Sequence, residues 1–212
     1  TLLQNYWMVI HPPILFLGFA STIVPFAYAY AGLANNKHDW IKFSLPWASF
    51  SAGILGVGIM MGAMWAYESL SFGGYWAWDP VENASLVPWL TLVAGLHCNL
   101  IYKSSGYSLR AVYFFYIISF VLILYSTFLT RSGVLGDTSV HAFTDLGMNW
   151  QLLLFILVFL IPALFLFFKR HACMQNSLFV NLPNFAGKNS VTTRFKSALR
   201  LQSDIEKAVA SD

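Results

Sequence analysis

The sequence predicts an all-α integral membrane protein with about five transmembrane helices and an external Trp-rich loop. Composition is the first reason: the 212 residues are 58% hydrophobic and only 10% charged, whereas soluble domains carry about 25% charged residues. The second reason is a set of five apolar runs long enough to cross a bilayer, which takes about 20 helical residues. These runs lie near 14–34, 43–67, 84–102, 111–130 and 151–168.

The five runs differ in composition. The first carries no charged residue. The second contains Gly58-Ile-Met-Met-Gly62, a small-xxx-small pattern that lets helices approach closely, and we interpret it as helix packing. The third holds His97 near its far end, the fourth is rich in Tyr and Phe, and the fifth is almost entirely Leu, Phe and Ile.

Residues 171–212 have a different composition, with many Asn, Ser, Lys and Arg residues and no run long enough to span. We therefore predict a transmembrane domain over 1–170 and a polar cytoplasmic tail over 171–212. The first residue is Thr1, and no basic segment or cleavage site precedes the first apolar run. From this we expect the chain to be a piece of a longer protein.

The basic residues indicate which loops face the cytoplasm. Five helices create two sets of loops: 1–13, 68–83 and 131–150 on one side, and 35–42, 103–110 and everything after 168 on the other. Eleven Lys and Arg residues fall on the second side, and only Arg131 falls on the first. The positive-inside rule then places the second side in the cytoplasm and the loop around residue 75 outside.

This outer loop, 68–90, carries most of the functional signal. Tyr75, Trp76 and Trp78 offer flat aromatic surface, and Gly74 allows the backbone to approach closely. Such a combination suits a large planar apolar ligand. An interfacial belt of Trp and Tyr is the alternative interpretation, because these residues gather at the membrane–water boundary in any case.

Asp79 and Glu82 follow these aromatic residues, and we interpret them as structural. Asp79 precedes Pro80, so it suits a helix N-cap with proline at the first helical position. Glu82 then occupies the third helical position of a capping box. Nothing in the sequence supplies a nucleophile–base arrangement, so acid–base catalysis by this pair is not supported.

Three histidines fall where a ligand would be useful. His11 lies just before the first run and His141 lies in the outer loop 131–150, so both share a side with the aromatic residues. Neutral imidazole is a common axial ligand of haem iron. His97 lies inside the third run, about five residues from its cytoplasmic end, where an ionisable group must be paired or bind something. His38 and His171 lie beside basic residues, and we interpret them as solvated.

Residues 73–90, Gly-Gly-Tyr-Trp-Ala-Trp-Asp-Pro-Val-Glu-Asn-Ala-Ser-Leu-Val-Pro-Trp-Leu, resemble the tryptophan-rich WWD motif of the haem-handling proteins of cytochrome c biogenesis. The Pro-Val-Glu-Asn-Ala-Ser portion is more similar to the CcmF branch, also named CycK or NrfE, than to CcmC or CcsA. Residues 2–18 and 131–143 are similar to the two segments of that branch that hold its external histidines. The three motifs occur in the family's order.

The resemblance implies a set of roles. His11 and His141 would be the axial ligands of a b-type haem held outside the membrane, with Tyr75, Trp76, Trp78, Asp79 and Gly74 forming the platform. His97 would ligate the iron of a second, intramembrane haem. The sequence departs from the family in having Tyr75-Trp76 where many members have Trp-Trp. It also has no intramembrane histidine after His97 that matches the second ligand of that haem.

The implied function is cytochrome c maturation as a haem lyase subunit in the bacterial inner membrane, with the WWD loop facing the periplasm. Its partners would be apocytochrome c, a haem chaperone and thiol-handling, apocytochrome-binding assembly subunits, and no nucleic acid is expected. Thioether formation at the Cys-x-x-Cys-His motif needs no protein nucleophile. The alternatives are a haem exporter that presents haem without attaching it, a membrane electron-transfer subunit, and a transporter whose Trp residues form a belt.

Overall fold

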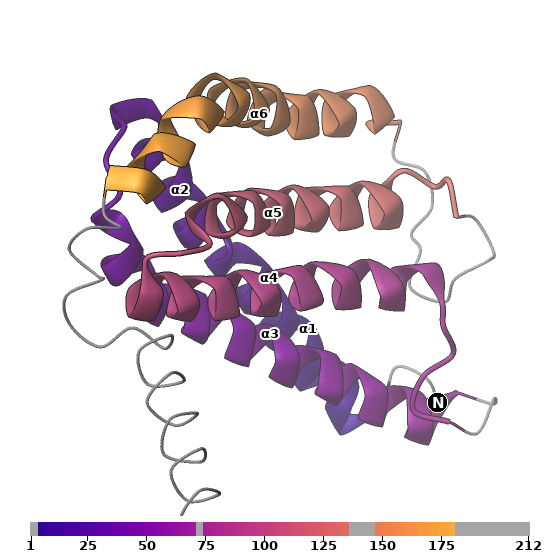
Figure 1. Cartoon of the computed structure of the whole chain (residues 1–212). Coiled ribbons are helices and arrows are strands. Elements are labelled where there is room, and N and C mark those ends of the chain that lie inside the picture. Colours follow the sequence, from indigo (N-terminus) through magenta and orange to yellow (C-terminus); the bar gives the residue numbers. More distant parts are fainter. Residues whose placement is uncertain (1–3, 71–73, 136–146, 181–212) are drawn as a thin grey trace, which may run out of the picture. The chain divides into compact units, whose positions relative to one another are not determined.

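The computed structural model describes residues 4–70, 74–135 and 147–180, and these residues are helical apart from short connections (Figure 1). The elements are α1 (Tyr6–Ser21), α2 (Ile23–Asn35), α3 (Trp40–Ser69), α4 (Pro80–Ser105), α5 (Leu109–Arg131) and α6 (Asn149–Val180). Within the described residues, five stretches are long and apolar enough to cross a membrane. They are Tyr6–Asn35, Trp40–Ser69, Pro80–Ser105, Leu109–Arg131 and Asn149–Arg170. The predicted all-α membrane fold with five spans is therefore confirmed.

The chain divides into two compact units, Thr1–His171 and Ala172–Asp212. The first unit contains α1 to α5 and α6 as far as His171. Of the second unit, only the last turns of α6 are described, and residues 181–212 lie outside the described residues. The candidate site belongs entirely to the first unit.

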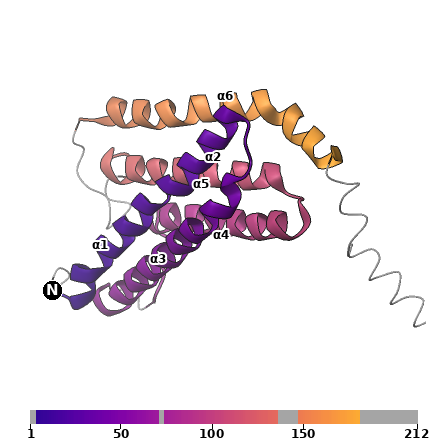
Figure 2. The same cartoon turned by 90° about the vertical axis from the view of Figure 1, so that its left-hand side faces the viewer.

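The first span begins earlier than predicted. α1 starts at Tyr6 and includes Pro12 and Pro13, which we had expected to precede the helix. α1 and α2 follow one another in nearly the same direction (Figure 2), and a break at Thr22 separates them. Its cause lies in α2, because Pro25 has no N–H to offer the carbonyl four residues earlier. At the break, the N–H and the hydroxyl of Thr22 both donate to the Phe19 carbonyl, at 3.2 and 2.6 Å.

α1 and α3 pack with almost no space between their backbones. A Cβ built on Gly58 would lie 2.8 Å from the Cα of Leu15, and one built on Gly18 would lie 2.7 Å from the Cα of Leu55. Real Cβ atoms do not approach other atoms this closely, so both contacts require glycine. The packing role predicted for the Gly58–Gly62 pattern is confirmed.

A buried polar contact joins α3, α4 and α5. The amide of Asn99 in α4, which has no exposed surface, donates to the Tyr116 hydroxyl of α5 at 2.8 Å and reaches the Ser44 hydroxyl of α3 at 3.2 Å. It also lies 3.3 Å from the Ile41 carbonyl of α3. Since lipid offers no hydrogen-bond partner, these bonds satisfy the amide N–H groups within the protein, whereas the Asn99 Oδ1 atom has no donor among the described residues. α4 and α5 lie side by side over their length (Figure 1).

An aromatic cluster attaches α6 to the other helices of the first unit. Phe159 of α6 meets Phe26 of α2 edge-on, with ring centres 5.8 Å apart, and Phe120 of α5 at 5.4 Å. Phe26 and Phe120 also contact each other at 4.7 Å. Over Asn149–Arg170, only Ile156 and Ala163 of α6 are buried, as expected for a helix that faces lipid or further protein.

Candidate functional site

The outer loop leads into a capped helix. The Asp79 carboxylate accepts the Val81 N–H at 2.9 Å, and the Glu82 carboxylate accepts the N–H groups of Ala77 and Asp79 at 2.9 and 3.3 Å. Pro80 occupies the first turn, so the predicted capping box is confirmed. The Asp79 carboxylate therefore fixes the start of α4 and thereby the end of the loop. The cofactor contact that we predicted for Asp79 remains a prediction.

Trp78 is the most exposed aromatic residue of the loop. Its side chain is 71% exposed, and its backbone is left-handed with φ of 59°, a conformation that costs a non-glycine residue about 1–3 kcal/mol. The Asn83 amide donates to the Trp78 carbonyl at 3.0 Å and holds this conformation. A strained backbone that presents an apolar ring to the surroundings is typical of a functional position.

Trp76 and Tyr75 complete the described part of the loop, residues 74–79, which we call the Trp loop. Tyr75 stacks on Tyr67 of α3 with ring centres 4.3 Å apart, and Trp76 meets Trp78 edge-on at 6.3 Å. The Trp76 indole N–H is buried and has no acceptor among the described residues. Leaving a buried donor unpaired costs about 1–3 kcal/mol. Gly74 is half-buried at the start of the loop.

An apolar groove of about 220 Å³ adjoins the Trp loop between α4 and α5. Pro80 and Asn83, next to the loop, form one end of it. Its lining is Pro80, Asn83, Ala84, Val87, Pro88, Leu122, Tyr125 and Leu129. The groove therefore begins at residues that directly follow the Trp loop and extends between two helices.

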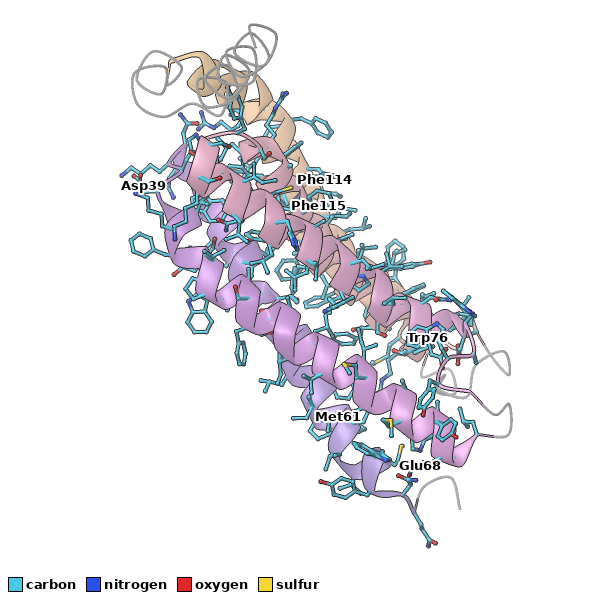
Figure 3. The ribbon with its side chains drawn as sticks, turned by 60° about the horizontal axis from the view of Figure 1, so that its bottom comes forward. Asp39, Met61, Glu68, Trp76, Phe114 and Phe115 are labelled. Carbon is cyan, nitrogen blue, oxygen red and sulfur yellow. The ribbon has the colours of Figure 1, made fainter. Side chains whose placement is uncertain are left out.

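Glu68 joins the start of α1 to the end of α3, a role that we had not predicted. Its carboxylate accepts from the Asn5 amide at 2.9 Å and from the Trp7 indole at 3.0 Å. Figure 3 shows Glu68 and Trp76 at the same end of the unit, with Asp39 at the opposite end. The one signal in the sequence was an isolated carboxylate at the end of a long apolar run.

His11 lies inside α1, so the prediction that it precedes the first span is wrong. Its Nδ1 lies 2.7 Å from the Gly58 carbonyl of α3. Its ring rests on Gly62, where a Cβ would lie 2.7 Å from the ring carbon Cε1. Gly62 is seven residues before the end of α3 at Ser69, about 10 Å along the helix axis. His11 is thus below the Trp loop, on the same side of the unit.

His97 lies deeper than predicted and faces outward. It is eight residues before the end of α4 at Ser105, not five, because α4 continues past residue 102. Seventeen residues separate it from Pro80, about 26 Å of helix. Its side chain is exposed and its Nδ1 bonds the Val93 carbonyl of its own helix at 2.8 Å. His11 and His97 therefore lie at different depths along the helices, so they belong to different sites.

His141, the second predicted external ligand, lies outside the described residues. Among the residues that the structure does describe, no three His, Cys, Asp or Glu side chains gather as a metal-binding group. The bis-histidine arrangement thus stays a prediction, and only its His11 half has a described environment.

His38 is not solvated, as the sequence had suggested, but belongs to a polar cluster at the opposite end of the unit. The Tyr113 hydroxyl accepts the Trp40 indole N–H at 2.9 Å and lies 2.9 Å from His38 Nδ1. It also donates to the Lys37 carbonyl at 3.4 Å. Burial lowers the pKa of His38 below its ordinary 6.5, against the opposing effect of Asp39. We call His38, Trp40 and Tyr113 the His38 cluster.

Residues 1–135 match the family described as cytochrome C assembly protein. The chain belongs to this family. The match includes α1 to α5 and the Trp loop, and it stops before the segment that holds His141. Membership in the family predicted from the WWD motif is therefore confirmed.

Relatives in the family include the cytochrome c-type biogenesis protein CcmF of Pseudomonas aeruginosa, which is 41% identical over 84% of this chain and 27% of the relative. CcmF of Escherichia coli is 38% identical over 80% of this chain and 26% of the relative. A solved structure named cytochrome c heme lyase CcmF superposes with a TM-score of 0.64 at 37% identity, over 78% of this chain and 26% of that one. The chain thus spans about a quarter of the length of these relatives.

Proposed function

We propose that this chain presents haem at the Trp loop for covalent attachment to the Cys-x-x-Cys-His motif of apocytochrome c, as part of a haem lyase. The observation that supports this most directly is the Trp loop itself, in a chain of the cytochrome c assembly family. It combines an exposed indole, a second indole with an unpaired buried N–H, and an adjoining apolar groove.

These features fit haem better than they fit a simple membrane belt. Haem has a flat apolar ring that suits the exposed face of Trp78. A belt needs neither a left-handed Trp nor a buried donor without an acceptor. The capping box keeps the platform rigid, because the loop is bonded directly to the first turn of α4.

The protein's part in the chemistry is orientation. Haem supplies the vinyl groups, and addition of each thiol converts one S–H and one C=C π bond into a C–S and a C–H bond, so no external oxidant is needed. The Trp loop would hold the ring edge accessible to the incoming peptide, and the groove would exclude water from the opposite edge. Nothing in this step requires a protein nucleophile, in agreement with the sequence.

His11 and His141 are the proposed axial ligands of this haem, which would be b-type until attachment. His97 is proposed as one ligand of a second, intramembrane b-type haem that supplies electrons. Its outward position supports a second ligand from protein beyond the described residues, and its Nδ1–Val93 bond leaves Nε2 as the ligating nitrogen.

The proposed location is the bacterial inner membrane with the Trp loop facing the periplasm. The charge distribution supports this orientation, since only Arg131 of the twelve Lys and Arg residues belongs to the Trp-loop side. There the loop would meet apocytochrome c, a haem chaperone and the thiol-handling assembly subunits. None of these partners would have to cross the membrane.

Absorbance spectra of the detergent-purified full chain, oxidised and dithionite-reduced, test the proposal. We expect the b-type spectrum of the external haem to be lost in the double variant His11→Ala with His141→Ala and in Trp78→Ala, while any contribution that depends on His97 remains. Trp47→Ala is the matched control, because Trp47 is 48% exposed on α3, far from the Trp loop. An undiminished spectrum in the double variant and in Trp78→Ala would contradict the proposal.

Two alternatives have distinguishable outcomes. A haem exporter would bind haem in the same way but would not support thioether formation when reduced haem and an apocytochrome peptide are supplied. An electron-transfer subunit would keep its spectrum in the His11 and His141 variants and lose it in His97→Ala. The exposed His97 gives this second alternative its support.

A further inference from the structure

The surroundings of His11 contain more than a packing contact. Its ring contacts the carbonyl of Gly58 and faces Gly62, and these two residues are one helical turn apart on α3. In an α-helix the carbonyl of residue 58 also accepts the N–H of residue 62, so one peptide carbonyl serves both bonds. The two glycines of the small-xxx-small pattern therefore have different neighbours: Gly58 faces Leu15 and Gly62 faces the His11 imidazole.

The bond to Gly58 determines where the imidazole carries its proton. A carbonyl oxygen only accepts, so the Nδ1 atom 2.7 Å away must carry the hydrogen. In the neutral ring, Nε2 is then the nitrogen with the lone pair. Metal-ligating histidines typically donate their other N–H to a carbonyl or carboxylate, which fixes the ring and makes the ligating nitrogen more basic.

Gly62 fixes the position of the ring. A Cβ at this residue would lie 2.7 Å from Cε1, 3.1 Å from Nε2 and 3.2 Å from Nδ1, so the whole Cε1 edge faces the glycine. Alanine would force the ring to turn or move, which would lengthen the Nδ1–Gly58 bond. Gly53 on the same helix has no atom within 4 Å of its built Cβ, so alanine there meets nothing.

We propose that Gly58 and Gly62 are positioning residues for His11: the Gly58 carbonyl holds the proton on Nδ1 and Gly62 admits the ring, so that Nε2 is presented as the ligand. The ligand role itself rests on the function proposed above. The arrangement of the His11 ring on Gly58 and Gly62, which we call the seat, is a property of the haem-free chain. The seat and the ligand role of His11 can therefore be tested separately.

The first test needs no haem. ¹⁵N NMR of histidine-labelled protein in detergent reports which ring nitrogen is protonated, with the His11 signals assigned by their loss in His11→Ala. We expect one fixed Nδ1–H tautomer in the wild type and in Gly53→Ala, and a mixture of tautomers in Gly62→Ala. An unchanged His11 signature in Gly62→Ala would overturn the inference.

A double-mutant cycle keeps the test valid if Gly62→Ala folds poorly. Removing the ring removes the collision, so His11→Ala should restore the stability that Gly62→Ala loses. We expect the two changes to couple by about tenfold in the unfolding equilibrium constant, and His11→Ala with Gly53→Ala to be additive. Additivity between positions 11 and 62 would contradict the proposed seat.

The haem-loaded full chain supplies the last readout. Loss of the Gly58 bond makes Nε2 a weaker donor, so Gly62→Ala should shift the reduction potential of the haem upward, with Gly53→Ala unchanged. If His11→Ala leaves the haem spectrum intact while Gly62→Ala changes the tautomer, the seat is correct and the ligand role is wrong. If His11→Ala abolishes the spectrum while Gly62→Ala changes neither tautomer nor potential, the seat is wrong.

Discussion

At the His38 cluster Trp40 is 9% exposed and its indole N–H donates to Tyr113, whereas in the Trp loop Trp78 is 71% exposed and the Trp76 N–H lacks an acceptor among the described residues. Both regions consist of Trp and Tyr beside a helix end. In one, burial and hydrogen bonding satisfy the polar groups, which is typical of a structural role. In the other, ring surface is exposed and a buried donor lacks an acceptor among the described residues. Residue type alone thus does not distinguish the His38 cluster from the Trp loop. The exposure of the rings and the hydrogen bonding of their polar groups do.

Replacing the buried and the exposed tryptophan should give the largest difference between the two regions. We expect Trp40→Ala to lower the free energy of unfolding by about 3–5 kcal/mol, because it leaves a cavity and removes the hydrogen bond from the indole to the Tyr113 hydroxyl. Trp78→Ala should change it by less than about 0.5 kcal/mol, as is usual for an exposed side chain. Denaturant titrations of both variants in the same detergent measure the difference. Equal destabilisation would mean that the Trp loop is also a structural core.

Gly32 tests how tightly the His38 cluster is packed. A Cβ on this residue would collide with the Trp40 ring and the Tyr113 hydroxyl. We therefore expect Gly32→Ala to cost about 1–3 kcal/mol, as overpacking does. Gly53→Ala is the control, since its Cβ has open space and should leave stability unchanged or raised. Thermal unfolding of the two variants, side by side, decides whether the cluster can adjust.

Asp79 tests whether the Trp loop depends on its cap. Asp79→Ala removes the acceptor for the first turn of α4 and should cost about 1 kcal/mol. Asp79→Asn keeps a good N-cap, so it should stay within a few tenths of a kcal/mol of the wild type. The pair also separates capping from haem contact. Loss of haem in Asp79→Asn with normal stability would assign the carboxylate a direct binding role.

The pH dependence of stability should come from His38, with the smallest effect of the four. Its pKa is lowered in the folded chain from the ordinary 6.5, so the unfolded chain binds the proton first as the pH falls. Stability should therefore decrease as the pH drops below about 6.5 and level off below the folded pKa. His38→Asn should flatten this part of the profile, measured by unfolding between pH 7.5 and 5.5. An unchanged slope would show that His38 is not the group responsible.

Helix existence could be predicted from the sequence because long apolar runs in lipid have few alternatives to a helix. The start of α1 could not, since Pro12 and Pro13 looked like a boundary. Prolines are tolerated inside membrane helices because neighbouring groups satisfy the freed carbonyls. The end of α4 was also placed three residues early, which misjudged the depth of His97.

The local part of the candidate site was predictable and the long-range part was not. The capping box of Asp79 and Glu82 could be read from residues three apart. The seat of His11 on Gly58 and Gly62, and the bond of His38 to Tyr113, join residues 47 and 75 positions apart. Their meeting depends on which faces of the helices pack, and one sequence does not specify this.

The Asn99 amide has a consequence for how the chain enters the membrane. Its contacts at Ile41 and Ser44 lie on the helix synthesised before it, and Tyr116 lies on the helix synthesised after it. When α4 leaves the ribosome, two acceptors for this polar group are already present, and the third is still to be made. We therefore expect α3 and α4 to insert as a hairpin and α5 to join it afterwards, so that a polar side chain does not have to enter lipid alone.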